Sequence, residues 1–295
     1  LPILGAGVET VRTQVLRQVG GYTYHFARTM AVPAVLAMVY VFTRSRYLST
    51  PSRLFWLAVT GCGLLALGSS GYRNGVAVVL LTVLVAYNYI VRRVKGRQLA
   101  LFVLGLLLLI GAYGFFRSAG SVSWDFSGIW DRVLHEVGLP HVTFTTIHGN
   151  FPAYLAFFRG RGMLLIFLAL APGEQPALGP LLKELLNLHY PGGGFAPSIL
   201  GSFYLEFGTP GILMGMFLCG LLLALLYYWM RERPSEYRVT VYGFVLVYCL
   251  EAIRDGMLKD IFPVWFLIAL LFVNIYCRRS PRLTLTWRGS GGARD

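Results

Sequence analysis

Charged residues are scarce in this sequence. Aspartate, glutamate, lysine and arginine make up 13% of the 295 residues, whereas hydrophobic residues make up 56%. Soluble domains carry about 25% charged residues, and a chain this long and apolar cannot bury its hydrophobic residues in one water-soluble core. The scarcity therefore excludes an ordinary soluble enzyme. It predicts an all-α, polytopic membrane helical bundle.

Cysteine is also rare, and its placement excludes two kinds of site. The four cysteines all fall in apolar runs, at Cys62, Cys219, Cys249 and Cys277. None has metal-ligand spacing, so we interpret them as packing residues and not as disulfide partners. The run Gly192–Gly194 is not followed by Gly-Lys-Ser/Thr, which excludes a nucleotide P-loop. We expect no metal and no cofactor.

Acidic residues are outnumbered by basic ones, which leaves a net charge of +13. In a soluble protein this excess would suggest a nucleic-acid partner. In a membrane protein the cytoplasmic loops collect arginine and lysine. We therefore interpret the excess as a topology signal and expect no nucleic acid.

Seven apolar runs are candidates for membrane-spanning helices, which need roughly 20 mostly apolar residues each. They are Tyr22–Phe42, Leu54–Ser70, Gly75–Val91, Leu99–Phe116, Thr209–Met230, Val239–Ile253 and Ile261–Cys277. These spans divide one membrane-embedded domain, 1–295, into four segments. The segments are four N-terminal membrane helices (22–116), a long extracytoplasmic helical loop (117–208), three C-terminal membrane helices (209–277) and a cytoplasmic tail (278–295).

Basic clusters predict the orientation of these spans. The clusters fall in alternate connections, at 44–53, 92–97, 231–238 and 278–282. By the positive-inside rule these connections are cytoplasmic, which predicts a multi-pass membrane protein. The apolar piece Met163–Ala171 in the outer loop is too short to span at about nine residues, so we expect a re-entrant, interfacial or buried segment.

Five arginines map to the outer face instead: Arg73, Arg117, Arg159, Arg161 and Arg254. Arginine near hydrocarbon costs on the order of 3 kcal/mol at the membrane centre and less at the interface, so it usually faces a polar cavity. A guanidinium binds phosphate oxygens in a bidentate manner. The alternative is that these side chains reach phospholipid headgroups. The short connections around Arg73 and Arg254 favour a functional role for those two.

The outer loop also holds candidate acids and bases. Four of the five histidines lie in it, and His148, shortly before Arg159, is our candidate base for a hydroxyl nucleophile. Glu206 lies in an apolar run two residues after Tyr204. It is interpreted as a base, an arginine partner or a sugar-binding group, and the alternative is an interfacial acid that points to water. The stretch His135–His141 matches no metal motif and supplies too few ligands.

Several glycines follow Glu206 in the sequence. The run Gly208-Thr209-Pro210-Gly211 predicts a break before a long apolar helix. Gly211 and Gly215 form a small-xxx-small pair, which predicts close packing between helices.

These residues resemble a known family. Ala171-Pro172-Gly173 with Gln175-Pro176, followed by GGGFAPSILGSFYLEFGTPGILMGMFLCGLLL, is similar to the pattern of O-antigen polymerases, also called Wzy-type or oligosaccharide repeat-unit polymerases. The family pattern P-S/T-L-L/I-G-x-x-Y-x-x-F-G-x-x-G is matched by Pro197, Ser198, Gly201, Tyr204, Phe207, Gly208 and Gly211. The turn ending at Arg73 also resembles the family's S-G-x-R turn. Members often carry an acid where this chain has Ser202, and they are usually longer, with ten or more membrane helices.

The resemblance implies a glycosyltransferase with a GT-C-like fold that polymerises undecaprenyl-diphosphate-linked oligosaccharide repeat units. Its partners would be lipid-linked donor and acceptor, membrane lipid, a chain-length regulator and a flippase. The protein would lie in the cytoplasmic (inner) membrane of a prokaryote, with its active site on the extracytoplasmic face. Among the outer arginines, Arg73 and Arg254 would bind the donor diphosphate, with help from Arg117 or Arg159. Tyr204 would lie at the substrate, and His148 or Glu206 would be the base.

Three other functions fit the same composition. An O-antigen ligase would use the same donor with a different acceptor. A transporter or flippase of lipid-linked sugars would need charged residues near the midplane of several helices, whereas most predicted spans have apolar centres, with Arg28 the main exception. A non-catalytic scaffold would leave the outer arginines as headgroup anchors.

Overall fold

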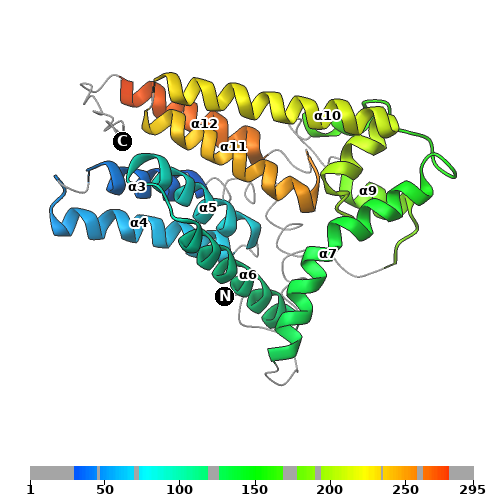
Figure 1. Cartoon of the computed structure of the whole chain (residues 1–295), viewed down its shortest axis with the longest axis horizontal. Coiled ribbons are helices and arrows are strands. Elements are labelled where there is room, and N and C mark those ends of the chain that lie inside the picture. The colour runs from blue at the N-terminus through cyan, green and yellow to red at the C-terminus, as the bar shows by residue number, and fades with distance from the viewer. Residues whose placement is uncertain are drawn as a thin grey trace, which may run out of the picture.

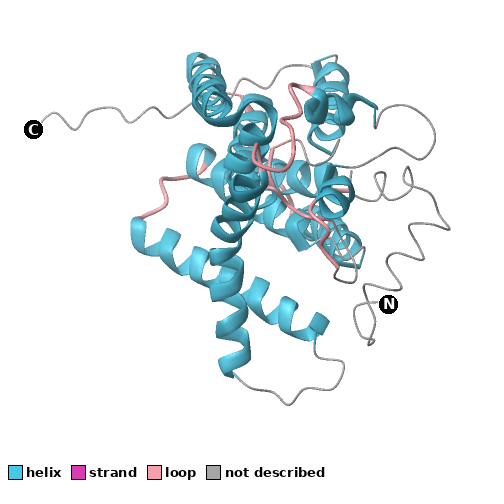
Figure 2. Cartoon of the chain, turned by 90° about the vertical axis from the view of Figure 1, so that its right-hand side faces the viewer, coloured by secondary structure: helices cyan, strands magenta, loops and turns pink. Residues whose placement is uncertain are grey.

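The computed structural model describes residues 30–44, 47–69, 73–118, 126–168, 178–189, 194–233, 235–257 and 262–278. Within these ranges the chain forms helices joined by loops, with no strand (Figure 2). The helices are α3 (Ala31–Arg44), α4 (Thr50–Ser69), α5 (Arg73–Ile90), α6 (Gly96–Ser118), α7 (Phe126–Asn150), α8 (Arg161–Leu168), α9 (Leu178–Leu185), α10 (Ser198–Glu232), α11 (Glu236–Asp255) and α12 (Phe262–Arg278). The all-α prediction is confirmed for this part of the chain.

Several of these helices have the composition of membrane spans. Thr50–Leu67 within α4 and the whole of α10 are long and apolar enough to cross a membrane, and Ala31–Arg44, Gly75–Ile90 and Gly96–Leu108 are shorter apolar helices. They agree with a membrane helical protein. The count of seven spans stays a prediction, because residues 22–29 of the first predicted span lie outside the described residues.

A bundle of α3, α4, α5, α11 and α12 forms the main body of the molecule, with α10 packed along α11 (Figure 1). Its core is made of aliphatic residues and two phenylalanines, Phe244 and Phe266, whose rings stack at 3.6 Å. The connections α3–α4, α5–α6 and α10–α11 all lie at the left-hand end in Figure 1. Three of the predicted cytoplasmic basic clusters therefore share one end of the bundle.

Small residues allow the backbones in this bundle to approach closely. A Cβ on Gly63 of α4 would lie 2.8 Å from the Cβ of Ala34 in α3, and the Thr60 hydroxyl donates to the Ala34 carbonyl at 3.3 Å. A Cβ on Gly243 of α11 would lie 3.2 Å from Val85 in α5. Such contacts are typical of helices that pack in lipid, where burying apolar surface offers little driving force.

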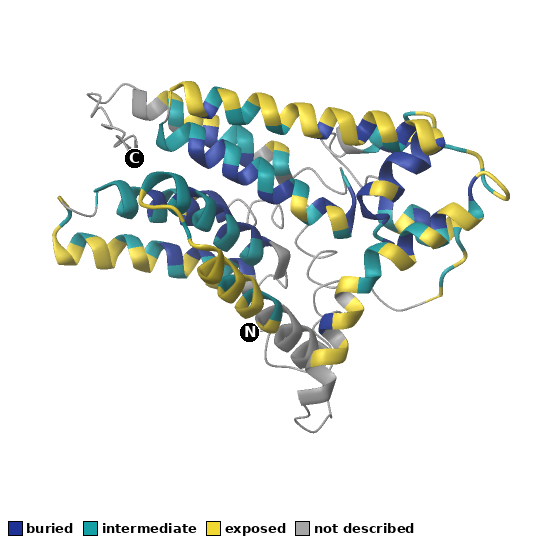
Figure 3. Cartoon of the chain, in the orientation of Figure 1, coloured by how far each residue is buried: buried dark blue, intermediate teal, exposed yellow. Residues whose placement is uncertain are grey.

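Exposed residues run along the outward faces of α4 and α10 (Figure 3), and many of them are large and apolar. On α10 they include Leu213, Met214, Phe217 and Leu225, each more than half exposed. A continuous face of this kind is an aggregation hazard in water and the normal surface of a helix in a bilayer.

The predicted outer loop is also helical where it is described. It holds the 25-residue α7, which includes Pro140, together with α8, α9 and the first part of α10. The apolar piece predicted at Met163–Ala171 falls largely in α8, whose eight residues cannot cross a bilayer. A second core joins these elements, formed by Ile147, Phe151, Leu178, Leu182, Phe195, Tyr204 and Leu205.

Helix α10 contains a sharp bend. Phe207 (φ −140°, ψ 16°) and Gly208 (φ 67°, ψ −150°) leave helical geometry, which confirms the break predicted at Gly208. The positive φ of Gly208 suits a residue without a Cβ. Pro210 lies in the first turn of the second half, where its missing N–H breaks no helical hydrogen bond. The helical half before the bend, Ser198–Glu206, is an element that the sequence analysis did not predict.

The two halves of α10 pack against each other. A Cβ on Gly211 would overlap the carbonyl oxygen of Phe203, and one on Gly215 would overlap the Phe203 ring. In a straight helix, residues twelve positions apart would be about 18 Å apart, so the bend folds the second half back onto the first. The small-xxx-small pair does serve close packing, but its partner is the same helix.

We expect Gly211→Ala to destabilise the protein. The new Cβ would meet rigid backbone at Phe203, and overpacking of this kind typically costs about 1–3 kcal/mol. Gly220→Ala is the matched control on the same helix, because nothing lies within 4 Å of its Cβ position, and it should be neutral or slightly stabilising. Thermal unfolding in detergent compares the two variants. Equal unfolding midpoints would contradict the close contact of Gly211 with Phe203 that the bend creates.

Candidate functional site

Five predicted site residues lie where α7, α8 and the bend of α10 meet: His148, Arg159, Arg161, Tyr204 and Glu206. This region lies at the right-hand side in Figure 1, next to α9. The second core holds this region together, because Ile147 in the last turn of α7 and Phe151, which directly follows α7, pack with Leu205 of α10. The site is thus built from segments more than forty residues apart in the chain.

Residues of the family-like pattern form the face of α10 that packs on α7. The Gly201 N–H donates to the Ser198 hydroxyl at 3.3 Å, and a Cβ on Gly201 would lie 2.7 Å from Ile147. The Tyr204 hydroxyl donates to the carbonyl of Phe151 at 3.1 Å. These pattern residues act here as packing elements, which place the start of α10 against α7.

Tyr204 and His148, both predicted as site residues, lie together. Their ring centroids are 5.2 Å apart, and the Tyr204 ring also contacts Phe144 and Phe157 edge-on. Tyr204 is 5% exposed, whereas His148 is exposed at the surface of α7. The His148 ring therefore packs against the buried ring of Tyr204, while His148 itself remains accessible to a solute.

The bend of α10 frees backbone acceptors that a neighbouring loop uses. Helix ends leave their last carbonyl groups without intrahelical partners. The carbonyl of Leu205 accepts from the N–H of Phe158 at 2.8 Å, and that of Glu206 accepts from the N–H of Arg159 at 3.0 Å. The loop before α8 is therefore bound to the broken end of the first helical half.

The Glu206 carboxylate caps the N-terminus of α8. Its Oε2 accepts from the Gly160 N–H at 2.6 Å, and the N–H groups of Gly162 and Met163 also donate to it. Helix N-termini leave N–H groups that carboxylates satisfy, and the helix dipole favours a negative charge there. Glu206 is 3% exposed, so this cap is an interior contact between α10 and α8.

The cap requires glycine at the start of α8. A Cβ on Gly162 would overlap Glu206 Oε1 and would lie 2.9 Å from the ring of Phe158. Gly160 has a φ of 89°, in the region that favours glycine. The two glycines thus permit the close approach of the carboxylate to the helix.

Arg159 and Arg161 flank Gly160 and are both exposed. Arg159 has a φ of 53°, which an arginine adopts at a cost of roughly 1–2 kcal/mol. Within the described part of the chain no acidic side chain pairs with either guanidinium. Two exposed cations without an acidic partner among the described residues therefore lie in a loop that Glu206 holds, and such a pair can bind an anionic ligand.

Arg254 lies at the end of α11, where its Nη1 forms an ion pair with Asp255 Oδ1 at 2.6 Å. The Arg254 side chain is 28% exposed and that of Asp255 only 7%. The helix ends at Gly256, whose φ is 90° and whose Cβ would lie 2.5 Å from the hydroxyl of Ser202. The end of α11 is therefore docked on the first half of α10.

The remaining two predicted arginines are described only in their backbone. Arg73 begins α5, and Arg117 lies in the last turn of α6. Their side chains lie outside the described residues. Their roles stay predictions.

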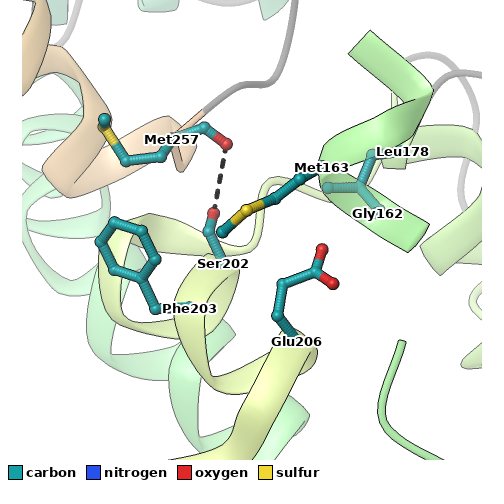
Figure 4. A pocket seen from close by; sticks show the side chains of 7 residues that line it. All are labelled: Gly162, Met163, Leu178, Ser202, Phe203, Glu206 and Met257. Carbon is teal, nitrogen blue, oxygen red and sulfur yellow. Dashed lines mark hydrogen bonds between the residues drawn. The ribbon is translucent and has the colours of Figure 1, made fainter. Parts of the chain in front are cut away.

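A small pocket lies between α8, α10 and the end of α11 (Figure 4). It is lined by Gly162, Met163, Leu178, Ser202, Phe203, Glu206 and Met257. The Glu206 carboxylate points toward α8, and the Ser202 hydroxyl donates to the Met257 carbonyl at 3.5 Å. The lining contains none of the predicted arginines, so we place the candidate binding surface at the exposed loop and not in this pocket.

Sequence reasoning missed the two loop glycines and the aromatic residues beside them. Phe157 lies 3.0 Å from the Cβ position of Gly208, and Phe158 packs in the second core. The loop could have been predicted from the run Phe158-Arg159-Gly160-Arg161-Gly162. Glycines that alternate with arginines indicate an unusual backbone conformation that presents cations.

Comparison with known proteins gives one match. The model of the O-antigen polymerase family matches residues 22–268. No curated protein and no solved structure matches the chain. The matched range contains every predicted site residue.

We expect Gly162→Ala to loosen the loop before α8, because the added methyl group displaces the Glu206 carboxylate. Trypsin, which cleaves after arginine, should then cut faster after Arg159 and Arg161, and the unfolding midpoint should fall. Gly138→Ala in α7, where nothing lies within 4 Å, is the control. Unchanged cleavage in Gly162→Ala would show that the carboxylate does not hold this loop.

Proposed function

The chain belongs to the O-antigen polymerase family, and from this membership we propose that it is a glycosyltransferase of the cytoplasmic membrane that joins undecaprenyl-diphosphate-linked oligosaccharide repeat units at the outer face. The family implies a polymerising role in surface polysaccharide synthesis with lipid-linked oligosaccharide substrates. The family match over residues 22–268 is the observation that carries this proposal. The outer face, the inner membrane and the GT-C-like fold are parts of the proposal.

In the proposed reaction, a hydroxyl oxygen of the acceptor glycan attacks the anomeric carbon of the donor glycan. The bond between that carbon and the diphosphate oxygen breaks, and undecaprenyl diphosphate leaves with the electron pair. A base takes the proton of the acceptor hydroxyl. The donor bond supplies the energy, so the reaction needs no nucleotide.

The arginines are proposed to bind the donor diphosphate and to stabilise the charge that develops on it. Arg159 and Arg161 are the leading candidates, because both are exposed and neither is paired with an acid in the described part of the chain. Arg73, Arg117 and Arg254 are proposed to assist. Arg254 already forms an ion pair with Asp255, so part of its positive charge is neutralised by that carboxylate.

His148 is proposed as the base in preference to Glu206. The His148 ring is exposed beside Tyr204, whereas the Glu206 carboxylate accepts hydrogen bonds from the backbone of α8. Tyr204 is proposed to support the His148 ring, because its hydroxyl is occupied by the Phe151 carbonyl. A chain-length regulator and a flippase are proposed as partners of the polymerase.

The arginine assignment predicts a loss of polymer in cells. We expect the double variant Arg159→Ala/Arg161→Ala to reduce the ladder of repeat lengths to single repeats while the protein level in the membrane stays normal. The control is Arg92→Ala/Arg93→Ala, which removes two exposed arginines at the predicted cytoplasmic end. A normal ladder from the Arg159/Arg161 variant would contradict the assignment. Long polymer that stays unattached would indicate a ligase instead.

The base assignment predicts a selective loss of rate. General-base catalysis contributes typically 10²–10⁴-fold, so His148→Ala should lower kcat by roughly that factor with little change in donor affinity. His141→Ala is the control, because His141 is exposed on the same helix. Elongation by purified protein measures both variants. A His148→Ala enzyme with normal kcat would remove His148 from the chemistry.

A further inference from the structure

Glu206 is the most buried acid near the arginine loop, and no step of the proposed reaction uses it. We propose that Glu206 is a positioning residue, which fixes the loop of Arg159 and Arg161 in the conformation that binds a lipid-linked diphosphate. The inference rests on the proposed function. It adds a role for the acid of the family-like segment that neither the family match nor the reaction assigns.

Burial and hydrogen bonding argue for this role. A carboxylate that is 3% exposed is strongly destabilised unless donors surround it. Its Oε2 is held by the Gly160 N–H, and its Oε1 faces Gly162 closely enough to exclude a Cβ there. Both oxygens are therefore directed at the backbone of α8.

Glu206 holds the arginine loop at two points. Its carbonyl oxygen accepts from the Arg159 N–H at 3.0 Å, and its side chain accepts from the next N–H along the chain, that of Gly160, at 2.6 Å. One residue thus fixes two successive amides of the segment that carries both arginines.

The loop needs these two hydrogen bonds because its backbone is strained at Arg159. Arg159 has a φ of 53° and Gly160 a φ of 89°. A non-glycine residue keeps the left-handed conformation only where its surroundings impose it. Without the Glu206 carboxylate, the Gly160 N–H would lose its acceptor, and the segment that carries both arginines would be held only through the Glu206 carbonyl.

The carboxylate also leaves the two guanidinium groups unneutralised. Across the described residues no ion pair joins Glu206 to Arg159 or Arg161, because the backbone amides of α8 occupy its oxygens. Glu206 therefore shapes the loop without competing for its charge. A diphosphate would meet two preorganised cations, and misplacement by about 1 Å can cost as much as 10²-fold in rate.

A double-mutant cycle on the full chain in detergent tests the inference, with binding of undecaprenyl diphosphate as the readout. We expect Glu206→Ala to weaken binding about tenfold or more. In the Arg159→Ala/Arg161→Ala background, adding Glu206→Ala should change binding by no more than about twofold, because coupled residues are not additive. Glu184→Ala, an exposed acid of α9, is the control and should bind normally.

The variant Glu206→Gln distinguishes a positioning role of Glu206 from a catalytic one. It also provides a second test in case Glu206→Ala fails to fold. The amide keeps one acceptor oxygen for α8, so this variant should bind with an affinity between those of wild type and Glu206→Ala. If Glu206 were the base, Glu206→Gln would bind normally and fail to elongate, which would overturn the inference. Normal binding by a folded Glu206→Ala, or a fully additive loss in the triple variant, would also overturn it.

The same cycle distinguishes failure of the inference from failure of the proposed function. A wild-type protein that binds undecaprenyl diphosphate but elongates nothing would refute the polymerase proposal, while the binding cycle still decides the role of Glu206. A protein that elongates normally but whose Glu206 variants bind like wild type would refute only the inference.

Discussion

The bend of α10 at Phe207 and Gly208 is the constraint on which the arrangement of the outer region depends. It ends one helical half at Glu206 and so frees two carbonyl groups, which accept from Phe158 and Arg159. It also directs the Glu206 side chain to the N-terminus of α8. A straight α10 would use the Leu205 carbonyl internally, through the N–H of Thr209, whereas Pro210 has no N–H to donate to the Glu206 carbonyl.

The same bend joins the apolar bundle to the helices of the predicted outer loop. The second half of α10 runs along α11, and its Gly211 and Gly215 pack on Phe203 of the first half. The end of α11 then docks on that first half through Gly256. A movement of the bend would therefore displace the arginine loop and Arg254 together. This coupling gives a physical reason for glycines and a proline in the family-like segment.

Composition and periodicity predicted the all-α class, the long apolar helices and the break at Gly208, because these depend on local sequence. The helix Ser198–Glu206 was missed, because nine residues after a glycine-rich turn resemble the start of a loop. The 25-residue α7 lies in the loop that was predicted to be helical, but its bounds were not predicted, because Pro140 and mixed polarity obscure its pattern. The cap on α8 could not be predicted at all: Gly160 and Glu206 are 46 positions apart, and only the fold brings them together.

The central claim is that this chain elongates lipid-linked glycans. The most direct measurement is to incubate the purified protein with a synthetic undecaprenyl-diphosphate oligosaccharide repeat unit and to separate the products by length. The account predicts a ladder of products, each longer by one repeat unit, formed without added nucleotide or metal. A substrate that remains a single repeat unit in the presence of folded protein would contradict it.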